Sequence, residues 1–327
     1  MLPDVNMPNR ETGNSRPRTN TTMLPCVFRY PGSKRLLMDG LQPYVSWLVE
    51  GCDRVVDAFV GGGAVTVWLA AHYRDLKIVA CDKDPFVAAF WQTISSTDDD
   101  VRRLRSALDV TPSLDLFDAI RDQMASPDAL STIQKAAFAV LDSRLSYSGI
   151  QNGGPQGGRH QTGKMKIGSR YQVQSVVRGV TLLHELLRDR FEAHEVDAVE
   201  FISQHSDLPY FVDPPYVEKG PQLYRVPMSE GEHGALALAL KGVECWVVTY
   251  DDHPLVLNLY AHAVIERLPV RYGGSRGEDG GWRGEYELVV TPGENAQMRH
   301  ERSRPRPADR DGGKRLIPEN EEMAMAA

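Results

Sequence analysis

The chain has 327 residues, of which 42% are hydrophobic and 25% charged, and its formal net charge is −7. This size and composition are typical of a globular protein with one large domain or two smaller ones. No apolar run approaches the roughly 20 residues that cross a bilayer, so we expect no membrane association. The acidic balance argues against a nucleic-acid partner, although a local basic face outweighs the whole-chain charge where phosphates bind.

Both ends of the chain are polar, and residues 1–22 and 295–327 are predicted to be disordered tails. The N-terminal stretch has no apolar signal core. Four cysteines occur without the spacing of a metal-binding pair, so no metal site is expected. Cys81 and Cys245 lie in apolar runs, which favours a reducing, cytoplasmic setting.

The first motif precedes any predicted strand. Residues 28–34 read Phe-Arg-Tyr-Pro-Gly-Ser-Lys, and the Pro-Gly pair is typical of a turn. Lys34 follows this turn at the start of a predicted helix, where its ammonium group can meet a carboxylate. By itself the stretch is an ordinary turn.

A strand–loop–helix–strand–helix unit follows. Residues 54–60 and 77–81 are short apolar runs with β-branched side chains, which predict buried strands. Residues 64–72 and 86–94 are predicted helices. This alternation indicates the start of a parallel, doubly wound sheet in an α/β fold.

Three glycines, residues 61–63, lie in the first strand-to-helix turn. Glycine permits a tight turn and the close approach of a ligand to the backbone. The spacing lacks the full GxGxxG of dinucleotide sites, and a purely structural turn is the alternative.

Asp82 ends the second predicted strand. A carboxylate at this position can accept hydrogen bonds from both ribose hydroxyls of a nucleoside. The alternative is a helix N-cap. Asp84 is the better cap candidate because it directly precedes Pro85, and proline suits the first helical turn.

Residues 96–192 differ in character from the rest and are predicted to be an insertion into a catalytic domain made of residues 23–95 and 193–294. Helical patterns cover most of 101–145 and 171–191, and a Gly-rich polar stretch separates them. Eight Lys or Arg and only two acids lie between Ser143 and Arg190. An insertion at the carboxyl edge of a sheet overhangs the ligand site, so it suits substrate selection.

After the insertion, alternating patterns resume. Strands are predicted at 195–201, 210–212, 245–250 and 286–291, and helices at 236–240 and 255–262.

The most informative stretch is Tyr210–Val217, which reads YFVDPPYV. Proline cannot continue a central strand, so the strand ends there. Asp213 and Tyr216 are then held on a stiff loop at the carboxyl end of the strand, the edge at which open α/β sheets bind ligands. The alternative is a simple turn with Asp as turn former.

Taken together, the motifs resemble those of S-adenosylmethionine-dependent methyltransferases that modify amino groups of DNA bases. Asp213-Pro-Pro-Tyr resembles motif IV, and Phe59-x-Gly61-x-Gly63 resembles motif I, with Ala58 where that family often has proline. Tyr30-to-Lys34 resembles motif X of the Dam-like adenine methyltransferases, the D12 class. The motif order matches that class, and the resemblance covers about residues 26–292.

The resemblance implies a Rossmann-like methyltransferase fold with a mainly helical inserted target-recognition domain. It implies site-specific methyl transfer to the N6 amino group of adenine in double-stranded DNA, with base flipping. Asp213 and the Pro214 carbonyl would accept the two amino N–H bonds, and Tyr216 would stack on the base. It also implies a monomer, with a restriction endonuclease as a partner to be tested. The residues implied to hold S-adenosylmethionine are Tyr30, Lys34, Asp57, Phe59, Gly61, Gly63, Asp82 and Asp213.

Other functions stay open at this point. N4-cytosine methyltransferases more often carry Ser where this chain has Asp213, and enzymes acting on protein amides favour Asn there. An RNA substrate is a related alternative. The last alternative is a non-catalytic DNA- or cofactor-binding relative.

Overall fold

The computed structural model describes residues 24–270 and 285–293. The predicted tails, 1–22 and 295–327, therefore lie outside the described residues. Among the residues it does describe, no helix combines the length and apolar character needed to cross a membrane.

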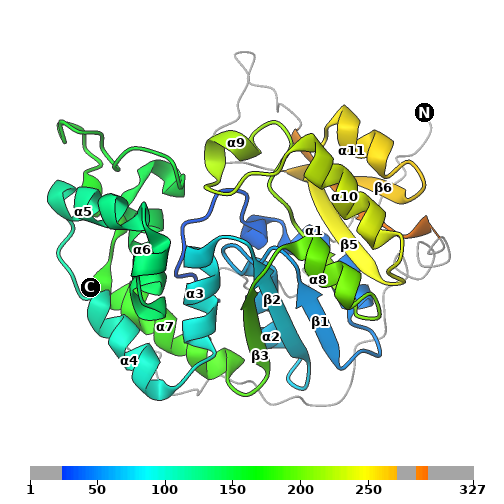
Figure 1. The fold of residues 1–327 in the computed structure, drawn as a ribbon, viewed down its shortest axis with the longest axis horizontal. Helices are drawn as coiled ribbons and strands as arrows, with labels where there is room; N and C mark the ends of the chain where they lie inside the picture. The colour runs from blue at the N-terminus through cyan, green and yellow to red at the C-terminus, as the bar shows by residue number, and fades with distance from the viewer. Residues whose placement is uncertain (1–23, 271–284, 294–327) are drawn as a thin grey trace, which may run out of the picture. The chain divides into compact units, whose positions relative to one another are not determined.

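A seven-stranded sheet forms the centre of the described part of the chain, and its mostly parallel α/β character confirms the predicted class (Figure 1). The strand order is β3-β2-β1-β4-β5-β7-β6. Strands β1 to β5 run parallel to one another, whereas β7 runs antiparallel to both β5 and β6. The strands are β1 (Arg54–Asp57), β2 (Lys77–Asp82), β3 (Phe191–Glu195), β4 (Tyr210–Val212), β5 (Trp246–Asp251), β6 (Val264–Val270) and β7 (Glu285–Thr291).

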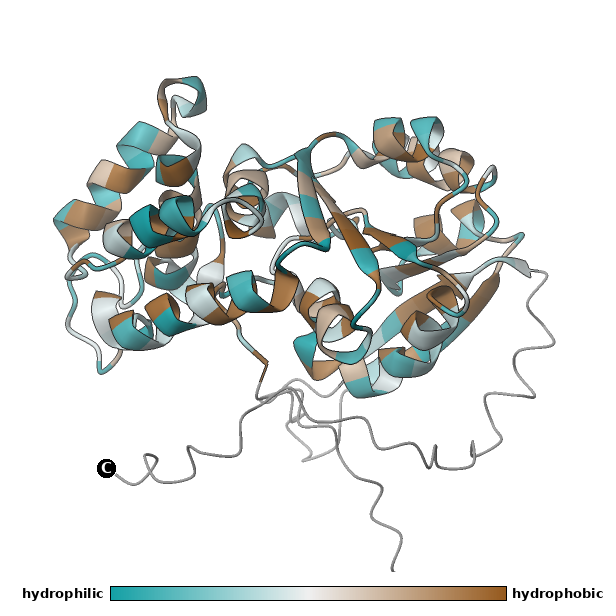
Figure 2. Cartoon of the chain, turned by 90° about the horizontal axis from the view of Figure 1, so that it is seen from below, coloured by the Kyte–Doolittle hydropathy of each residue, from teal (hydrophilic) through white to brown (hydrophobic). Residues whose placement is uncertain are grey.

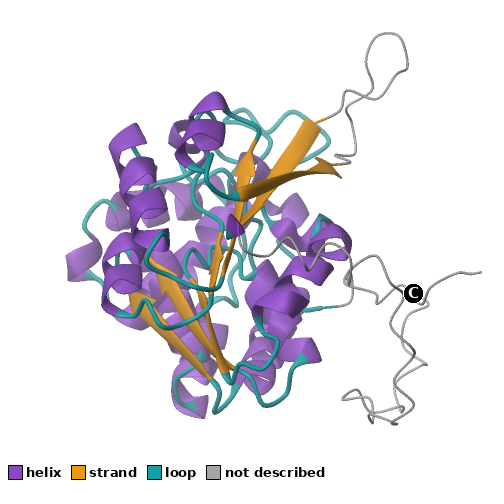
Figure 3. Ribbon diagram, turned by 90° about the vertical axis from the view of Figure 1, so that its right-hand side faces the viewer, coloured by secondary structure: helices purple, strands orange, loops and turns teal. Residues whose placement is uncertain are grey.

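Helices cover both faces of the sheet (Figure 3). Successive strand residues point to opposite faces, so Val55 packs in one hydrophobic cluster and Val56 in another. The first cluster includes α1 (Met38–Leu48) and α2 (Ala64–His72). The second includes α8 (Ala198–Gln204), α10 (Glu230–Leu240) and α11 (Pro254–Leu259).

The predicted insertion, residues 96–192, contains the four α-helices α4 to α7. Helix α3 directly precedes it. Hydrophobic and hydrophilic residues alternate along these helices (Figure 2), and α6 packs against α3, α4 and α5. The buried residues of these helices belong to the same hydrophobic cluster as α1 and α2. The insertion therefore shares a continuous core with one face of the sheet. The helices are α3 (Pro85–Ile94), α4 (Asp98–Ala107), α5 (Leu114–Met124), α6 (Thr132–Leu145) and α7 (Val173–Leu187).

The strand predicted at 195–201 is wrong. The strand there is β3, at 191–195, and residues 198–204 form α8. Asp197 starts this helix by accepting a hydrogen bond from Val199 N, 2.9 Å away. Strand β3 escaped prediction because it lies at the sheet edge and four of its five residues are exposed or half-buried.

The helix predicted to begin near Lys34 is α1, which begins at Met38. Two further elements were not predicted: β6 and the short helix α9 (Gly220–Leu223). Each contains a proline, at positions 269 and 221, a residue that argues against a regular element. Strand β6 tolerates its proline at the edge of the sheet, where a missing N–H disrupts only one ladder.

Candidate functional site

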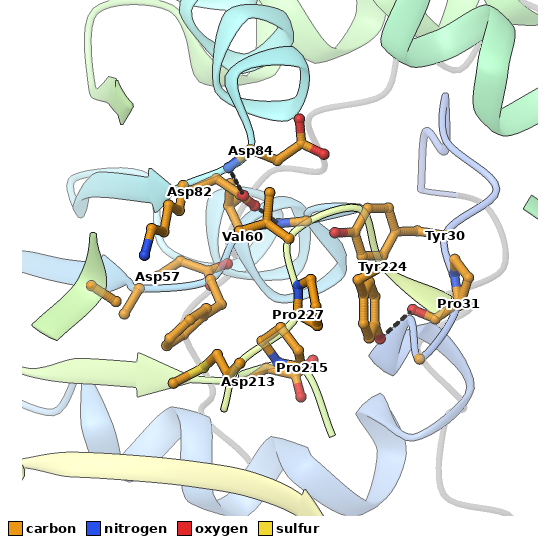
Figure 4. Close-up of a pocket in the computed structure, with 18 of the residues that line it drawn as sticks. Tyr30, Pro31, Asp57, Val60, Asp82, Asp84, Asp213, Pro215, Tyr224 and Pro227 are labelled. Atoms are coloured by element: carbon orange, nitrogen blue, oxygen red, sulfur yellow. Dashed lines mark hydrogen bonds between the residues drawn. The ribbon is translucent and has the colours of Figure 1, made fainter. Parts of the chain in front are cut away.

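The site lies where the strand order reverses, at the carboxyl ends of β1, β2 and β4. Asp57 ends β1, Asp82 ends β2, and Asp213 directly follows β4. Because these strands are parallel neighbours, the three carboxylates meet at one edge of the sheet. They line a cavity of about 290 Å³ (Figure 4).

The glycine turn forms the floor beside Asp82. Gly61 adopts a φ of +43° and lines the cavity, and its N–H donates a hydrogen bond to Asp82 Oδ2 at 3.0 Å. Gly63 has a different task and does not line the cavity. A Cβ on Gly63 would lie 2.1 Å from the ring of Trp91, whose Nε1 donates to the Gly61 carbonyl. Gly63 therefore allows the packing that shapes the turn.

Two tyrosines close one side of the cavity. A Cβ on Gly61 would lie 2.7 Å from the Tyr30 ring, so glycine is needed where this ring covers the turn. The rings of Tyr30 and Tyr224 lie side by side with centroids 5.7 Å apart (Figure 4). The Tyr224 hydroxyl donates to the Pro31 carbonyl at 3.0 Å, which fixes the ring against the motif that holds Lys34.

Burial makes two of the carboxylates weak acids. Asp57 accepts a hydrogen bond from Thr66 Oγ1 at 2.7 Å, yet its burial raises its pKa to about 7. Burial also raises the pKa of Asp82 to about 7, and the charge of Asp84 adds to the shift. Asp84 caps α3 by accepting from Phe86 N at 2.9 Å, as predicted.

Asp213 belongs to a buried ionic cluster. Lys34 Nζ lies 2.5 Å from Asp213 Oδ1 and 3.1 Å from Glu287 Oε1, and it also donates to the Tyr216 hydroxyl at 2.9 Å. Thr249 Oγ1 donates to the same Asp213 oxygen, at 2.9 Å. Asp213 Oδ2 has no hydrogen-bond partner among the described residues, and the side chain is 19% exposed beside the cavity.

Charges in this cluster compensate one another. Burial disfavours the Lys34 ammonium, but Asp213, Tyr216 and Glu287 outweigh it and hold the pKa of Lys34 well above its usual value. Burial raises the pKa of Asp213 and of Glu287, while Lys34 opposes both shifts. One cation thus serves two carboxylates, and the cluster as a whole is an anionic acceptor for N–H groups.

Comparison with known protein families decides what this arrangement belongs to. The model of the D12 class N6 adenine-specific DNA methyltransferases matches residues 30–267, a span that contains Lys34, the glycine turn and Asp213. The chain belongs to this family. This match confirms the resemblance, and the chain is a DNA adenine-N6 methyltransferase of a class that uses S-adenosylmethionine. No curated protein matches the chain.

Most predicted site residues of the methyltransferase share the cavity. The predicted site residues that line it are Tyr30, Lys34, Asp57, Phe59, Gly61, Asp82 and Asp213. All three N–H groups of Lys34 have protein acceptors nearby, including the Gly32 carbonyl at 3.0 Å. Its contact with the cofactor carboxylate stays a prediction.

Pro214 and Tyr216 of the DPPY motif are not among the residues that line the cavity. Pro214 is buried, and Pro215 takes the place in the wall. Tyr216 is 8% exposed, and its hydroxyl donates to Glu287 Oε1 at 2.5 Å. Stacking of Tyr216 on a base stays a prediction, and the structure adds a second task, which is to bridge Lys34 and Glu287.

Sequence reasoning missed several residues of the methyltransferase site. Glu287 lies in an apolar strand, and its position opposite Asp251 follows from the antiparallel pairing of β5 and β7. A single acid inside a buried strand was the available signal, because burial of an acid requires a partner. Tyr224 carried no comparable signal, because it follows a Pro-containing stretch, residues 220–223, that was not predicted to be the helix α9.

Proposed function

We propose that this methyltransferase transfers a methyl group from S-adenosylmethionine to the N6 amino group of adenine at a specific site in double-stranded DNA, with the base rotated out of the helix. The observation that carries the proposal is Asp213. Its Oδ2 atom has no partner among the described residues and lies beside a cavity that Asp82 and Gly61 also line.

The residues of the cavity fit this cofactor. Asp82 would accept hydrogen bonds from the ribose hydroxyls, and the bare backbone of Gly61 permits close approach. Phe59 and Val60 add apolar surface beside the three carboxylates, which suit a positively charged molecule. When bound, S-adenosylmethionine supplies a methyl group already activated by a positively charged sulfur.

Asp213 and Pro214 would orient the amine. The Pro214 carbonyl accepts no hydrogen bond from the residues that the structure describes, so it and Asp213 Oδ2 offer two acceptors for the two N–H bonds of the amino group. Hydrogen bonds to both N–H groups favour a pyramidal nitrogen with its lone pair free. Lys34 and Thr249 hold Asp213 from behind, so the acceptor needs no rearrangement. An adenine inside a duplex cannot reach these groups, and extrusion costs a few kcal/mol.

The modified nucleoside tests this proposal. DNA methylated by the purified protein with labelled S-adenosylmethionine is digested, and the labelled nucleoside is identified. We expect N6-methyladenosine in its deoxy form. Label on cytosine, or on RNA or protein in place of DNA, would contradict the assignment.

Cofactor affinity is expected to rise as the pH increases through 7. Asp82 has a raised pKa of about 7, so it is protonated below that pH and loses acceptor capacity. For one linked proton the Kd should fall by up to about tenfold per pH unit below pH 7, and level off above about pH 8. Calorimetric titration between pH 6 and 8.5 measures this. Asp82→Asn should bind weakly with a flatter profile, and an unchanged steep profile in that variant would exclude Asp82 as the titrating group.

The inserted segment, residues 96–192, is the proposed DNA-recognition module. Several of its basic side chains have structural partners: Arg144 donates to the Val27 carbonyl, Arg190 to the Ala70 carbonyl, and Arg188 pairs with Asp98. Lys164 and Arg170 are exposed and make no ion pair within the described ranges. They are the proposed phosphate contacts.

Alanine variants of Lys164 and Arg170 should bind DNA more weakly at low salt. Each should also reduce the slope of log Kd against log salt concentration by about one, because one fewer counterion is released. Fluorescence anisotropy at several salt concentrations gives the slope. Lys77→Ala is the matched control, since Lys77 is exposed at the opposite end of β2. Slopes equal to that control would remove both residues from the interface.

A further inference from the structure

Arg225 connects one wall of the cavity to the inserted segment through ion pairs. Tyr224, Val226, Pro227 and Met228 line the cavity, but Arg225 does not. Its guanidinium group bridges two carboxylates, Asp84 and Asp142, whose side chains are only 4% and 2% exposed. The Nη1–Oδ2 distance to Asp84 is 2.5 Å, and the Nη2–Oδ2 distance to Asp142 is 2.9 Å.

The two ends of this bridge belong to different parts of the molecule. Asp84 caps α3 and lies two residues after Asp82, whose Oδ1 accepts a hydrogen bond from the Asp84 N–H at 2.9 Å. Asp142 lies on α6 in the inserted segment and also pairs with Arg121, 2.6 Å away. Arg225 therefore connects the loop that carries Asp82 to a helix of the inserted segment.

A set of hydrogen bonds joins the same two segments next to this ion-pair bridge. Gln151, which follows α6, accepts a hydrogen bond from Arg225 N at 2.6 Å, and its own N–H donates to the Leu223 carbonyl at 3.2 Å. Asn152 Nδ2 donates to the Tyr224 carbonyl at 3.1 Å. Gln151 also lines the cavity. The inserted segment thus supplies part of the wall itself. The hydrogen bonds of Gln151 and Asn152 fix the position of Tyr224.

We propose that Arg225 is a positioning residue that couples occupancy of the cavity by the cofactor to DNA binding by the inserted segment. The inference rests on the proposed function, because it assigns one ligand to each side of the bridge. A ligand that orders the cavity wall also orders α6 and residues 151–152 through Arg225, so the second ligand meets a segment that is already ordered. The coupling is reciprocal, so DNA must tighten cofactor binding by the factor by which the cofactor tightens DNA binding.

The experiment measures the Kd of S-adenosylhomocysteine, which supports no turnover, with and without saturating plasmid DNA that the wild-type protein methylates. We expect DNA to tighten wild-type binding by about 5- to 150-fold. Arg225→Lys keeps one positive charge but lacks the planar guanidinium group whose Nη1 and Nη2 atoms contact the two carboxylates separately, so the ratio should fall to within about twofold of one. Arg121→Lys, which alters the other partner of Asp142 but does not touch the wall, should retain the wild-type ratio.

The outcomes separate the inference from the proposed function. Wild-type protein that binds neither ligand would overturn both. Wild-type protein that binds both ligands with a ratio of one, or a folded Arg225→Lys variant with the wild-type ratio, would overturn the coupling alone. Equal loss in Arg121→Lys would also overturn it, because the effect would then belong to α6 in general. If Arg225→Lys does not fold, Asn152→Ala replaces it as the test, because it removes the hydrogen bond to the Tyr224 carbonyl without leaving a buried charge unpaired. This variant should also lower the ratio, and an unchanged ratio would count against the inference.

Discussion

Asp213→Ala should reduce the rate of methyl transfer by about a thousandfold, the upper end of the loss found when one preorganised polar group is removed from an active site. The variant lacks the carboxylate that would accept an amino N–H bond beside the cavity. The protein should still fold, because Lys34 keeps Glu287 at 3.1 Å and the Tyr216 hydroxyl at 2.9 Å as partners. The loss should therefore appear in kcat far more than in the Kd of the cofactor.

Labelled methyl transfer, calorimetric cofactor binding and thermal unfolding together measure this prediction. Asp252→Ala is the matched control, because Asp252 pairs with Arg267 at a partly exposed site outside the cavity. That control should keep wild-type turnover. An Asp213→Ala protein with near-normal turnover would refute the proposed role of the carboxylate, and one that does not fold would show that Glu287 cannot hold Lys34 alone.

Lys34→Met should lower the free energy of unfolding by about 3–5 kcal/mol, far more than the matched control below. The substitution leaves two buried carboxyl groups, Asp213 and Glu287, without the cation that both share. Lys83→Met is the matched control. Lys83 also pairs with two acids, Asp197 and Glu232, but it is 51% exposed, and such pairs contribute about 0–1 kcal/mol.

The pH dependence of Lys34→Met has a definite sign. Without Lys34, burial and mutual repulsion leave the pKa values of Asp213 and Glu287 above those of the unfolded chain. The folded variant then binds more protons than its unfolded state between those pKa values, so its stability falls as the pH rises. Denaturant titrations should show a greater deficit at pH 8 than at pH 6. An equal deficit at both pH values would contradict the shared-cation account.

A double variant tests the same cluster from the other side. Glu287→Gln removes one of the two stranded carboxyl groups, so the combination with Lys34→Met should be more stable than the sum of the two single effects predicts. Strict additivity would mean that Lys34 and Glu287 do not interact in the folded protein.

Local patterns identified most of the fold and much of the site. The runs at 54–57, 77–82 and 246–251 carry apolar side chains on both faces of the sheet because these strands are buried in its middle. Their composition alone therefore identifies them as strands. Edge strands lack that mark, which explains why β3 was misplaced and β6 was missed. The Pro-Pro and triple-glycine turns are equally local, because they restrict or free their own backbone.

The residues at strand ends and turns, which are Asp57, Asp82, Asp213 and the glycines at 61–63, can be predicted from local sequence, since each depends on neighbours a few positions away. The groups that complete the site follow from long-range packing instead. Glu287 reaches Lys34 because β7 pairs antiparallel with β5, and Arg225 joins Asp84 to Asp142 because a loop folds back over the cavity. These partners lie tens to hundreds of residues apart along the chain, and no local pattern encodes the packing that brings them together.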